Sequence, residues 1–173
     1  MRVLIIYASK NGVTERCAQL LKQSLPNCEV TLHNLKTGQP DLGASYDWVV
    51  VGGPIRFEKL YRPVRVFLSA QNDWLKQQSL ALFLCCGLVD RFDDYLRLIP
   101  SSLRESARDI ACFGGEIKPD KVRGWDRLFL RFLRESIISE EEGNRGEYER
   151  VLPEIVTENI TRLAEIIRGI RPV

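Results

Sequence analysis

Short apolar runs alternate with longer amphipathic stretches along this chain of 173 residues. Four of the runs are continuous, which is typical of strands that are buried on both faces of a sheet. A fifth stretch, residues 28–35, alternates between apolar and polar positions and predicts a less buried strand. The predicted strands cover residues 3–7, 28–35, 48–51, 80–86 and 110–113.

Amphipathic stretches with helical periodicity follow most of these strands. Pro26 ends the first of them, and Pro100 interrupts the third. Because apolar strands alternate with helices, the pattern predicts an α/β fold built on a parallel sheet. The predicted helices cover residues 13–25, 63–70, 92–107, 128–138 and 155–170.

Composition narrows the class of protein. Hydrophobic residues make up 45% of the chain and charged residues 28%, which is typical of a folded globular domain. The net charge of +2 does not favour nucleic acid as a partner. No apolar run approaches the roughly 20 residues of a membrane-spanning helix, and no secretion signal is recognisable. We therefore expect a cytoplasmic protein with a single domain over residues 1–173.

Five cysteines occur, most of them inside apolar runs. An odd number of cysteines in such positions predicts reduced, buried thiols rather than disulfides. Because the sequence has no CxxC motif and His33 is its single histidine, it predicts no metal site. The cysteines are Cys17, Cys28, Cys85, Cys86 and Cys112.

Small and polar residues connect the first strand to the first helix. Ser9 and Thr14 supply hydroxyl groups, and Gly12 lets the backbone bend close to an anion. The helix N-terminus adds N–H groups and a partial positive charge, so this loop is a candidate phosphate site. A plain turn explains the same spacing equally well. Neither GxGxxG nor GxxxxGK[ST] follows this strand, which disfavours NAD and ATP as ligands.

Two more loops are expected beside this one, because the carboxyl ends of parallel strands meet at one edge of a sheet. They cover residues 53–61 and 87–92, and each begins with a glycine that permits close approach to a planar ligand. Phe57, Tyr61 and Phe92 are candidate stacking groups for such a ligand. Each of these aromatic residues is also compatible with ordinary core packing.

The chain resembles the flavodoxin-like family in all three loops. Residues 9–14 (SKNGVT) are similar to that family's phosphate loop, and residues 47–55 (DWVVVGGPI) to its third strand and the loop flanking the flavin ring. Residues 84–88 (LCCGL) are similar to its second ring-flanking loop. The resemblance implies a doubly wound, five-stranded parallel sheet in the order 2-1-3-4-5, with an insert after strand five. It also implies FMN as the cofactor, and because the flavin supplies the redox chemistry, we assign no catalytic residue.

The resemblance implies two groups of FMN-binding residues. Arg56, in the second group, is either a solvent-facing loop residue or a cation near substrate carboxylates or the reduced flavin. The phosphate group comprises Ser9, Lys10, Asn11, Gly12, Val13 and Thr14. The ring group comprises Pro54, Ile55, Arg56, Phe57, Cys86, Gly87 and Leu88.

A narrower resemblance concerns the segment after the fifth strand. Residues 114–117 (GGEI), residues 125–127 (WDR) and the ring-loop residues 55–57 (IRF) are similar to flavodoxin-type protoporphyrinogen IX dehydrogenases. This resemblance implies an oxidoreductase that passes electrons from a small-molecule substrate, a porphyrinogen, to a quinone. The alternatives are a flavodoxin-type electron carrier that docks on partner redox proteins, and a module that has lost the flavin. The net charge of +2 does not favour the acidic docking face of a carrier.

Residues 125–134 predict a helix with one apolar and one basic face, the latter formed by Arg127, Arg131 and Arg134. Either this helix docks on the sheet with its basic side in solvent, or it contacts an anionic membrane surface where a quinone is available. We also expect residues 115–135 to border the flavin site and to carry specificity for the substrate or acceptor, because they directly follow the fifth strand.

Overall fold

The computed structural model describes residues 1–116 and 154–170 of the chain. These residues belong to one of its two compact units, Met1–Glu116 with Pro153–Val173. The other unit, Ile117–Leu152, lies outside the described residues. The helix predicted at residues 128–138 and the basic face predicted at residues 125–134 therefore also lie outside them. The single-domain organisation stays a prediction.

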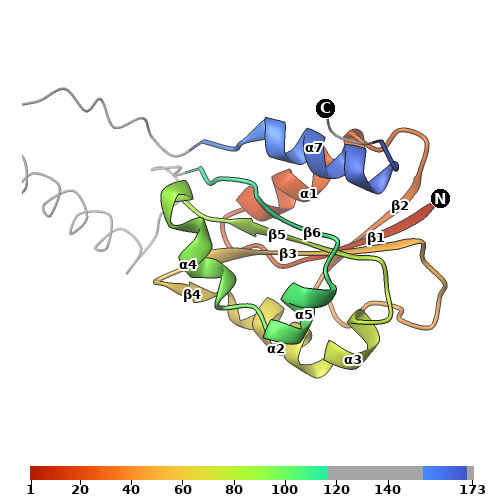
Figure 1. Cartoon of the computed structure of the whole chain (residues 1–173), viewed down its shortest axis with the longest axis horizontal. Coiled ribbons are helices and arrows are strands. Elements are labelled where there is room, and N and C mark those ends of the chain that lie inside the picture. Colours follow the sequence, from red (N-terminus) through yellow and green to blue (C-terminus); the bar gives the residue numbers. More distant parts are fainter. Residues whose placement is uncertain (117–153, 171–173) are drawn as a thin grey trace, which may run out of the picture. The chain divides into compact units, whose positions relative to one another are not determined.

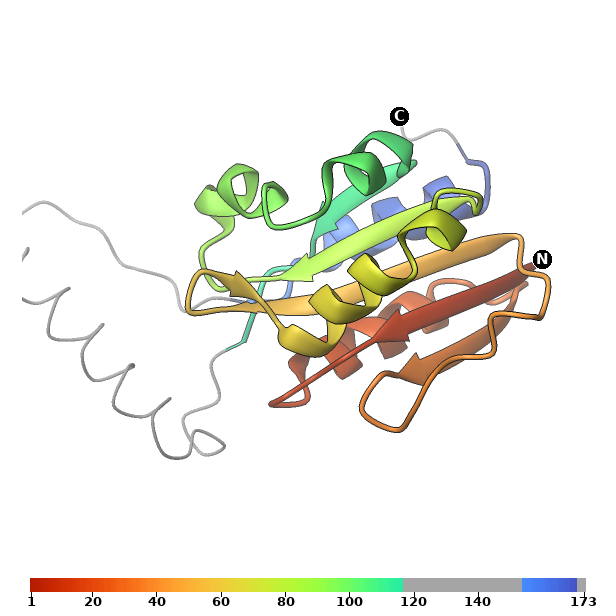
Figure 2. The same cartoon turned by 90° about the horizontal axis from the view of Figure 1, so that it is seen from below.

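A parallel sheet with helices on both faces forms the described unit (Figure 1 and Figure 2). A short strand, β4 (Lys59–Leu60), pairs with the end of the central strand in the antiparallel sense. The parallel strands lie in the order β2 (Glu29–Asn34), β1 (Arg2–Tyr7), β3 (Trp48–Arg56), β5 (Leu80–Cys85) and β6 (Asp109–Cys112). The predicted order 2-1-3-4-5 is confirmed, because β5 and β6 are the fourth and fifth predicted strands.

The register aligns the carboxyl ends of neighbouring strands. Tyr7 of β1 pairs with Gly52 of β3, and Gly52 in turn pairs with Phe83 of β5. Leu84 of β5 pairs with Cys112 of β6. The segments that leave β1, β3, β5 and β6 therefore begin at the same edge of the sheet.

Alternate side chains of each strand enter two separate cores, one on each face of the sheet. On β1, Leu4 and Ile6 belong to one core, and Val3 and Ile5 belong to the other. None of these four side chains is more than 1% exposed. This burial on both faces explains why the strand is a continuous apolar run in the sequence.

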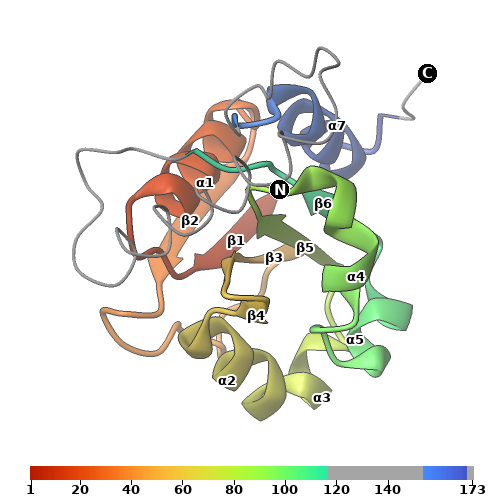
Figure 3. The ribbon, with the colours of Figure 1, turned by 90° about the vertical axis from the view of Figure 1, so that its left-hand side faces the viewer.

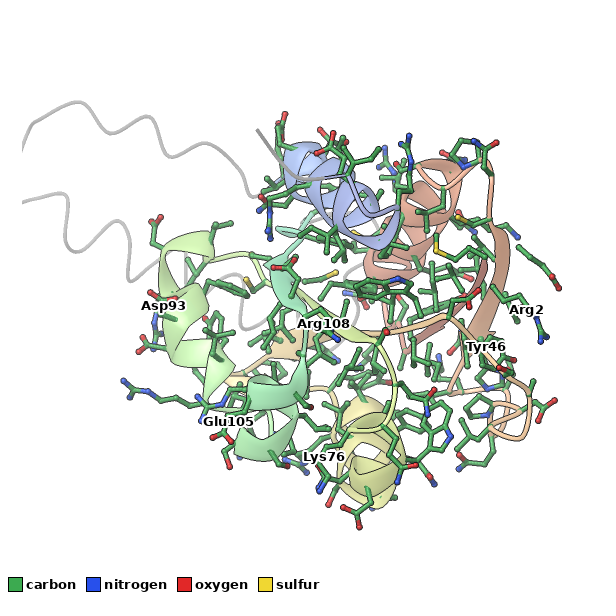
Figure 4. The ribbon with its side chains drawn as sticks, turned by 45° about the vertical axis from the view of Figure 1, so that its right-hand side comes forward. Arg2, Tyr46, Lys76, Asp93, Glu105 and Arg108 are labelled. Carbon is green, nitrogen blue, oxygen red and sulfur yellow. The ribbon has the colours of Figure 1, made fainter. Side chains whose placement is uncertain are left out.

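Helices cover each core (Figure 3). Charged side chains such as Lys76, Asp93 and Glu105 lie on their outer surfaces and are exposed (Figure 4). The core that contains Leu4 is covered by α2 (Arg62–Ala70), α3 (Asn72–Leu75), α4 (Phe92–Leu96) and α5 (Ser101–Ser106). The core that contains Val3 is covered by α1 (Val13–Gln23) and α7 (Thr157–Ile167).

The central strand is longer than its apolar run predicts. We expected a strand at residues 48–51 and a loop at 53–61, whereas β3 continues to Arg56 and turns back into β4 as a hairpin. The buried residues Gly52 and Gly53 have no side chains to extend the apolar pattern, so the sequence pattern appears to end there. The predicted loop is therefore a two-stranded projection from the edge of the sheet.

The helical stretch predicted at residues 92–107 is divided. A 3-10 turn, η1 (Val89–Arg91), leads into α4, and Pro100 is the N-cap residue of α5. Proline lacks the N–H that a continuous helix needs, which explains the break. The short α3 was not among the predicted helices, while α7 lies within the predicted range 155–170.

All five cysteines are free, and every one except the half-buried Cys28 is buried. The prediction of reduced thiols in the core is confirmed for these four residues. No helix within the described ranges is long and apolar enough to cross a membrane.

Candidate functional site

Four segments meet at the carboxyl edge of the sheet, the end that faces the viewer in Figure 3. Backbone hydrogen bonds hold the strand ends together there: the Ala8 N–H donates to the Gly52 carbonyl at 3.3 Å, and the Phe113 N–H donates to the Leu84 carbonyl at 2.9 Å. The predicted phosphate group therefore lies after β1, next to the ring-group residues on β3 and after β5.

The segment between β1 and α1 forms a tight turn that ends in an uncapped helix. The Gly12 N–H donates to Ser9 Oγ at 3.0 Å, and Ser9 is only 7% exposed. Gly12 is the N-cap residue with φ 84°, a left-handed conformation, and no side chain caps the first turn of α1. The N–H groups of this turn therefore remain suited to an external acceptor. No atom lies within 4 Å of the position that a Cβ on Gly12 would occupy.

Thr14 lies in the first turn of α1 but is directed toward the core. Its side chain is 1% exposed and forms a hydrogen bond with the Cys85 thiol. The hydroxyl group thus links α1 to the end of β5. In this arrangement the backbone N–H of Thr14 is its contribution to the first turn.

An acidic residue in the same turn is held by a tyrosine. The Tyr7 hydroxyl donates to Glu15 Oε1 at 3.0 Å. Burial and the neighbouring Glu15 carboxylate raise the pKa of Tyr7 to about 12. Glu15 was not among the predicted site residues, and its pairing with Tyr7 ties its carboxylate to the end of β1.

The hairpin of β3 and β4 presents an aromatic ring at its tip. Phe57 and Glu58 form the two-residue turn, with φ of 49° and 58°. Phe57 is 50% exposed, and the Arg56 guanidinium carbon lies 5.4 Å from the centroid of its ring. An exposed ring beside a cation at this edge can stack on a flat ligand.

The segment after β5 exposes apolar side chains next to this hairpin. Cys86 is buried, whereas Gly87 is exposed and Leu88 and Val89 are 54% and 42% exposed. Together with Phe57, Leu88 and Val89 make up half of the six large hydrophobic residues that are exposed in the described part of the chain. The carboxyl edge therefore has more exposed apolar surface than the pattern of the sequence suggested.

Glu58 joins the hairpin to the segment after β5. The Arg91 Nη1 atom lies 3.0 Å from Glu58 Oε1, and the Tyr95 hydroxyl donates to the same oxygen at 3.4 Å. The side chains of Arg91 and Glu58 are 48% and 55% exposed, so this ion pair positions the two segments more than it stabilises the fold. None of the three residues was predicted as a site residue.

The segment after β6 is tied to α1 by an ion pair. Arg16 Nη1 lies 3.1 Å from Glu116 Oε2, and the backbone of Gly115 accepts no side chain because Cys86 and Gly87 pack against it. This pairing brings the last described residue before residue 117 beside the helix that follows the phosphate loop.

The predicted site residues differ in burial. Ser9, Thr14 and Cys86 are buried; Gly12, Val13, Pro54, Ile55 and Arg56 are half-buried; Lys10, Asn11, Phe57, Gly87 and Leu88 are exposed.

Comparison with known families identifies the chain. Residues 4–143 match the family model Flavodoxin_5, described as a flavodoxin domain. The chain therefore belongs to the flavodoxin family, a family of FMN-binding redox proteins. No match was found among curated proteins.

Solved structures show the same fold at low sequence identity. The two-electron reduced flavodoxin of Megasphaera elsdenii is 21% identical, with 73% of this chain and 94% of that chain covered and a TM-score of 0.51. The rubredoxin oxygen:oxidoreductase of Desulfovibrio gigas is 15% identical, with a TM-score of 0.47; the match covers 97% of this chain but only 37% of that one. The Fusobacterium nucleatum flavodoxin bound to flavin mononucleotide is 11% identical, with 63% and 68% covered and a TM-score of 0.44.

Proposed function

We propose that the chain binds FMN at the carboxyl edge of its sheet and acts as an FMN-dependent redox protein. The observation that carries this proposal is the uncapped first turn of α1, which follows β1 directly in a chain of the flavodoxin family. An uncapped helix N-terminus beside a hydroxyl group favours a phosphate. Its place on the sheet edge, next to an exposed aromatic ring, is what an attached flat ring system needs.

The phosphate would be held by backbone N–H groups and short polar side chains. The Ser9 hydroxyl is already oriented by its bond to the Gly12 N–H, and the exposed Asn11 amide is a further donor. The residues proposed for this part are Ser9, Lys10, Asn11, Gly12, Val13 and Thr14.

The ring would lie between the hairpin and the segment after β5. Phe57 would stack on it, while Pro54, Ile55, Arg56, Cys86, Gly87 and Leu88 would flank it, largely through their backbones. When bound, FMN supplies one- and two-electron transfer. The chain's own residues bind it, orient it and exclude water from one side.

The finer proposal is oxidation of a porphyrinogen with a quinone as acceptor. The exposed apolar side chains of Phe57, Leu88 and Val89 lie beside the cations of Arg56 and Arg91. An apolar molecule with carboxylates matches that combination. Residues 115–135 are proposed to add specificity, and residues 125–134 a peripheral membrane contact, although both proposals concern residues mostly outside the described ranges.

The alternative is a flavodoxin-type carrier that exchanges electrons with a partner redox protein. Its support is the same exposed apolar group, which suits a protein partner as well as a small molecule. The two proposals differ in whether a small substrate is turned over.

Flavin binding tests the first proposal. The full chain is titrated with FMN, and quenching of flavin fluorescence reports binding. Ser9→Ala should weaken FMN binding while leaving riboflavin, which has no phosphate, unaffected. Ser45→Ala, an exposed serine outside the site, is the matched control. No quenching by the wild-type chain would reject the proposal.

Turnover separates the two finer candidates. The FMN-loaded chain is incubated without oxygen with protoporphyrinogen and a soluble quinone, and porphyrin fluorescence is followed. Appearance of porphyrin at a rate proportional to the protein supports the dehydrogenase. Electron exchange with a redox protein in the absence of porphyrin formation supports the carrier.

A further inference from the structure

Two buried thiols lie side by side where the segment after β5 meets β6. Cys86 Sγ and Cys112 Sγ are 3.3 Å apart, and the two residues are 3% and 5% exposed. Leu84 pairs with Cys112, and Cys86 lies two residues further along on the same face of the sheet. A disulfide has an S–S distance of about 2.0 Å, so closure requires roughly 1 Å of movement.

Cys112 lies among groups that stabilise a thiolate. The Gly114 N–H donates to its sulfur, and the Asn159 Nδ2 group donates to its carbonyl at 2.7 Å, which fixes the backbone. Gly114 has φ 69°, and a Cβ there would lie 2.1 Å from the Glu154 carbonyl oxygen, so the donor is held by a position that only glycine can fill.

The two thiols divide their protons unequally. The hydrogen bond from Cys86, together with the Gly114 N–H, lowers the pKa of Cys112 to about 7, against the opposing effect of burial. The same hydrogen bond and burial raise the pKa of Cys86. The pair therefore loses its first proton from Cys112 and keeps the second on Cys86.

A second thiol contact on the opposite face of the sheet lacks this arrangement. Cys17 and Cys85 interact there, and the pKa of Cys85 is raised well above its usual value by Cys17 and by burial. A protonated, fully enclosed thiol is a poor nucleophile. The contrast singles out Cys86 and Cys112.

We propose that Cys86 and Cys112 form a redox-active dithiol that closes to a disulfide when the protein meets a peroxide. The exposed residues Gly87 and Leu88 directly follow Cys86, which gives a small uncharged oxidant a short route to the pair. The inference does not depend on the proposed function, because it concerns thiols of the chain alone.

The chemistry balances with hydrogen peroxide as the oxidant. The Cys112 thiolate attacks one peroxide oxygen, the O–O bond breaks, and Cys112 becomes a sulfenic acid as hydroxide leaves and takes up a proton. The Cys86 thiol then attacks the Cys112 sulfur, forming the S–S bond and releasing water. In sum, two thiols and one peroxide give one disulfide and two waters. The disulfide would tie the segment that carries Gly87 and Leu88 to β6.

Mass spectrometry of the intact, folded chain tests this proposal. The protein is treated with hydrogen peroxide, remaining thiols are alkylated, and the chain is digested without reduction. We expect a tryptic peptide spanning residues 77–91 to be linked to the peptide that contains Cys112. Fragmentation between Cys85 and Cys86 assigns the bond, so the wild-type chain alone decides the result. Cys112→Ser should abolish the link, and Cys28→Ser, at the half-buried thiol, should retain it.

Three results would overturn the proposal. Full alkylation of Cys86 and Cys112 after peroxide treatment would show that the pair does not react. Oxidation of Cys112 to a sulfinic acid without a link would show that Cys86 does not resolve it. A link through Cys85 would place the reactive pair on the wrong face of the sheet.

Discussion

Replacing Gly12 with alanine tests whether the first turn of α1 holds the phosphate of FMN. Gly12 has φ 84°, and no atom lies within 4 Å of the position of an added Cβ. The methyl group would thus meet no neighbour, and its cost is purely conformational, about 1–2 kcal/mol for an L-residue in the left-handed region. For a chain of this size that corresponds to a melting temperature lower by roughly 2–8 °C.

The same substitution should weaken FMN binding selectively. Alanine relieves the strain by turning φ negative, which moves the N–H groups at the start of α1 away from the phosphate. Loss of one hydrogen bond to a charged group costs about 1.5–3 kcal/mol, or roughly a 10- to 150-fold rise in Kd. Flavin fluorescence quenching measures this, with riboflavin as the ligand without a phosphate. Gly12→Asn is the matched variant, because asparagine tolerates the left-handed conformation.

Two outcomes would refute this reasoning. If Gly12→Ala weakened riboflavin and FMN equally, the loop would contact the ring or would have lost its fold. If FMN bound as tightly to Gly12→Ala as to the wild type, the first turn of α1 would not hold the phosphate.

Three further predictions concern the core and the site edge. Gly52→Ala should lower the free energy of unfolding by about 3 kcal/mol, because its Cβ would lie 1.9 Å from the Phe83 ring, while Gly43→Ala should change it by less than about 0.5 kcal/mol in urea denaturation. Because the pKa of Tyr7 is raised from 10 to about 12, its contribution to stability is present below pH 10 and is lost as pH rises to 12; Tyr7→Phe should remove this slope, and an unchanged slope would contradict the assignment. Phe57→Ala should raise the Kd for FMN roughly two- to tenfold with little change in melting temperature, whereas equal affinity would exclude stacking by this half-exposed ring.

The sheet could be predicted because its chemistry is local. Each face of β1 is buried, so residues 3–7 form an unbroken apolar run that only a two-sided strand explains. The hairpin after β3 was missed because Gly52 and Gly53 interrupt the apolar pattern, although both are buried. The orientation of Thr14 toward Cys85 depends on how α1 packs on the sheet, which no local pattern reveals.

The contacts between segments could not be predicted from the sequence. Glu58 and Arg91 are 33 positions apart, and Cys86 and Cys112 are 26 apart. Each pair meets only because the strand order and register bring the two segments to one edge. A charged residue in a loop or a cysteine in an apolar run has the same local pattern whether or not such a partner exists.

Amide hydrogen exchange of the full chain with and without FMN tests the central claim most directly. The account predicts that FMN slows exchange at residues 9–14, 54–57 and 86–88, the three segments at the carboxyl edge, and leaves the amino edge of the sheet unchanged. Protection confined to other segments, or no protection at FMN concentrations that saturate binding, would contradict an FMN site at this edge.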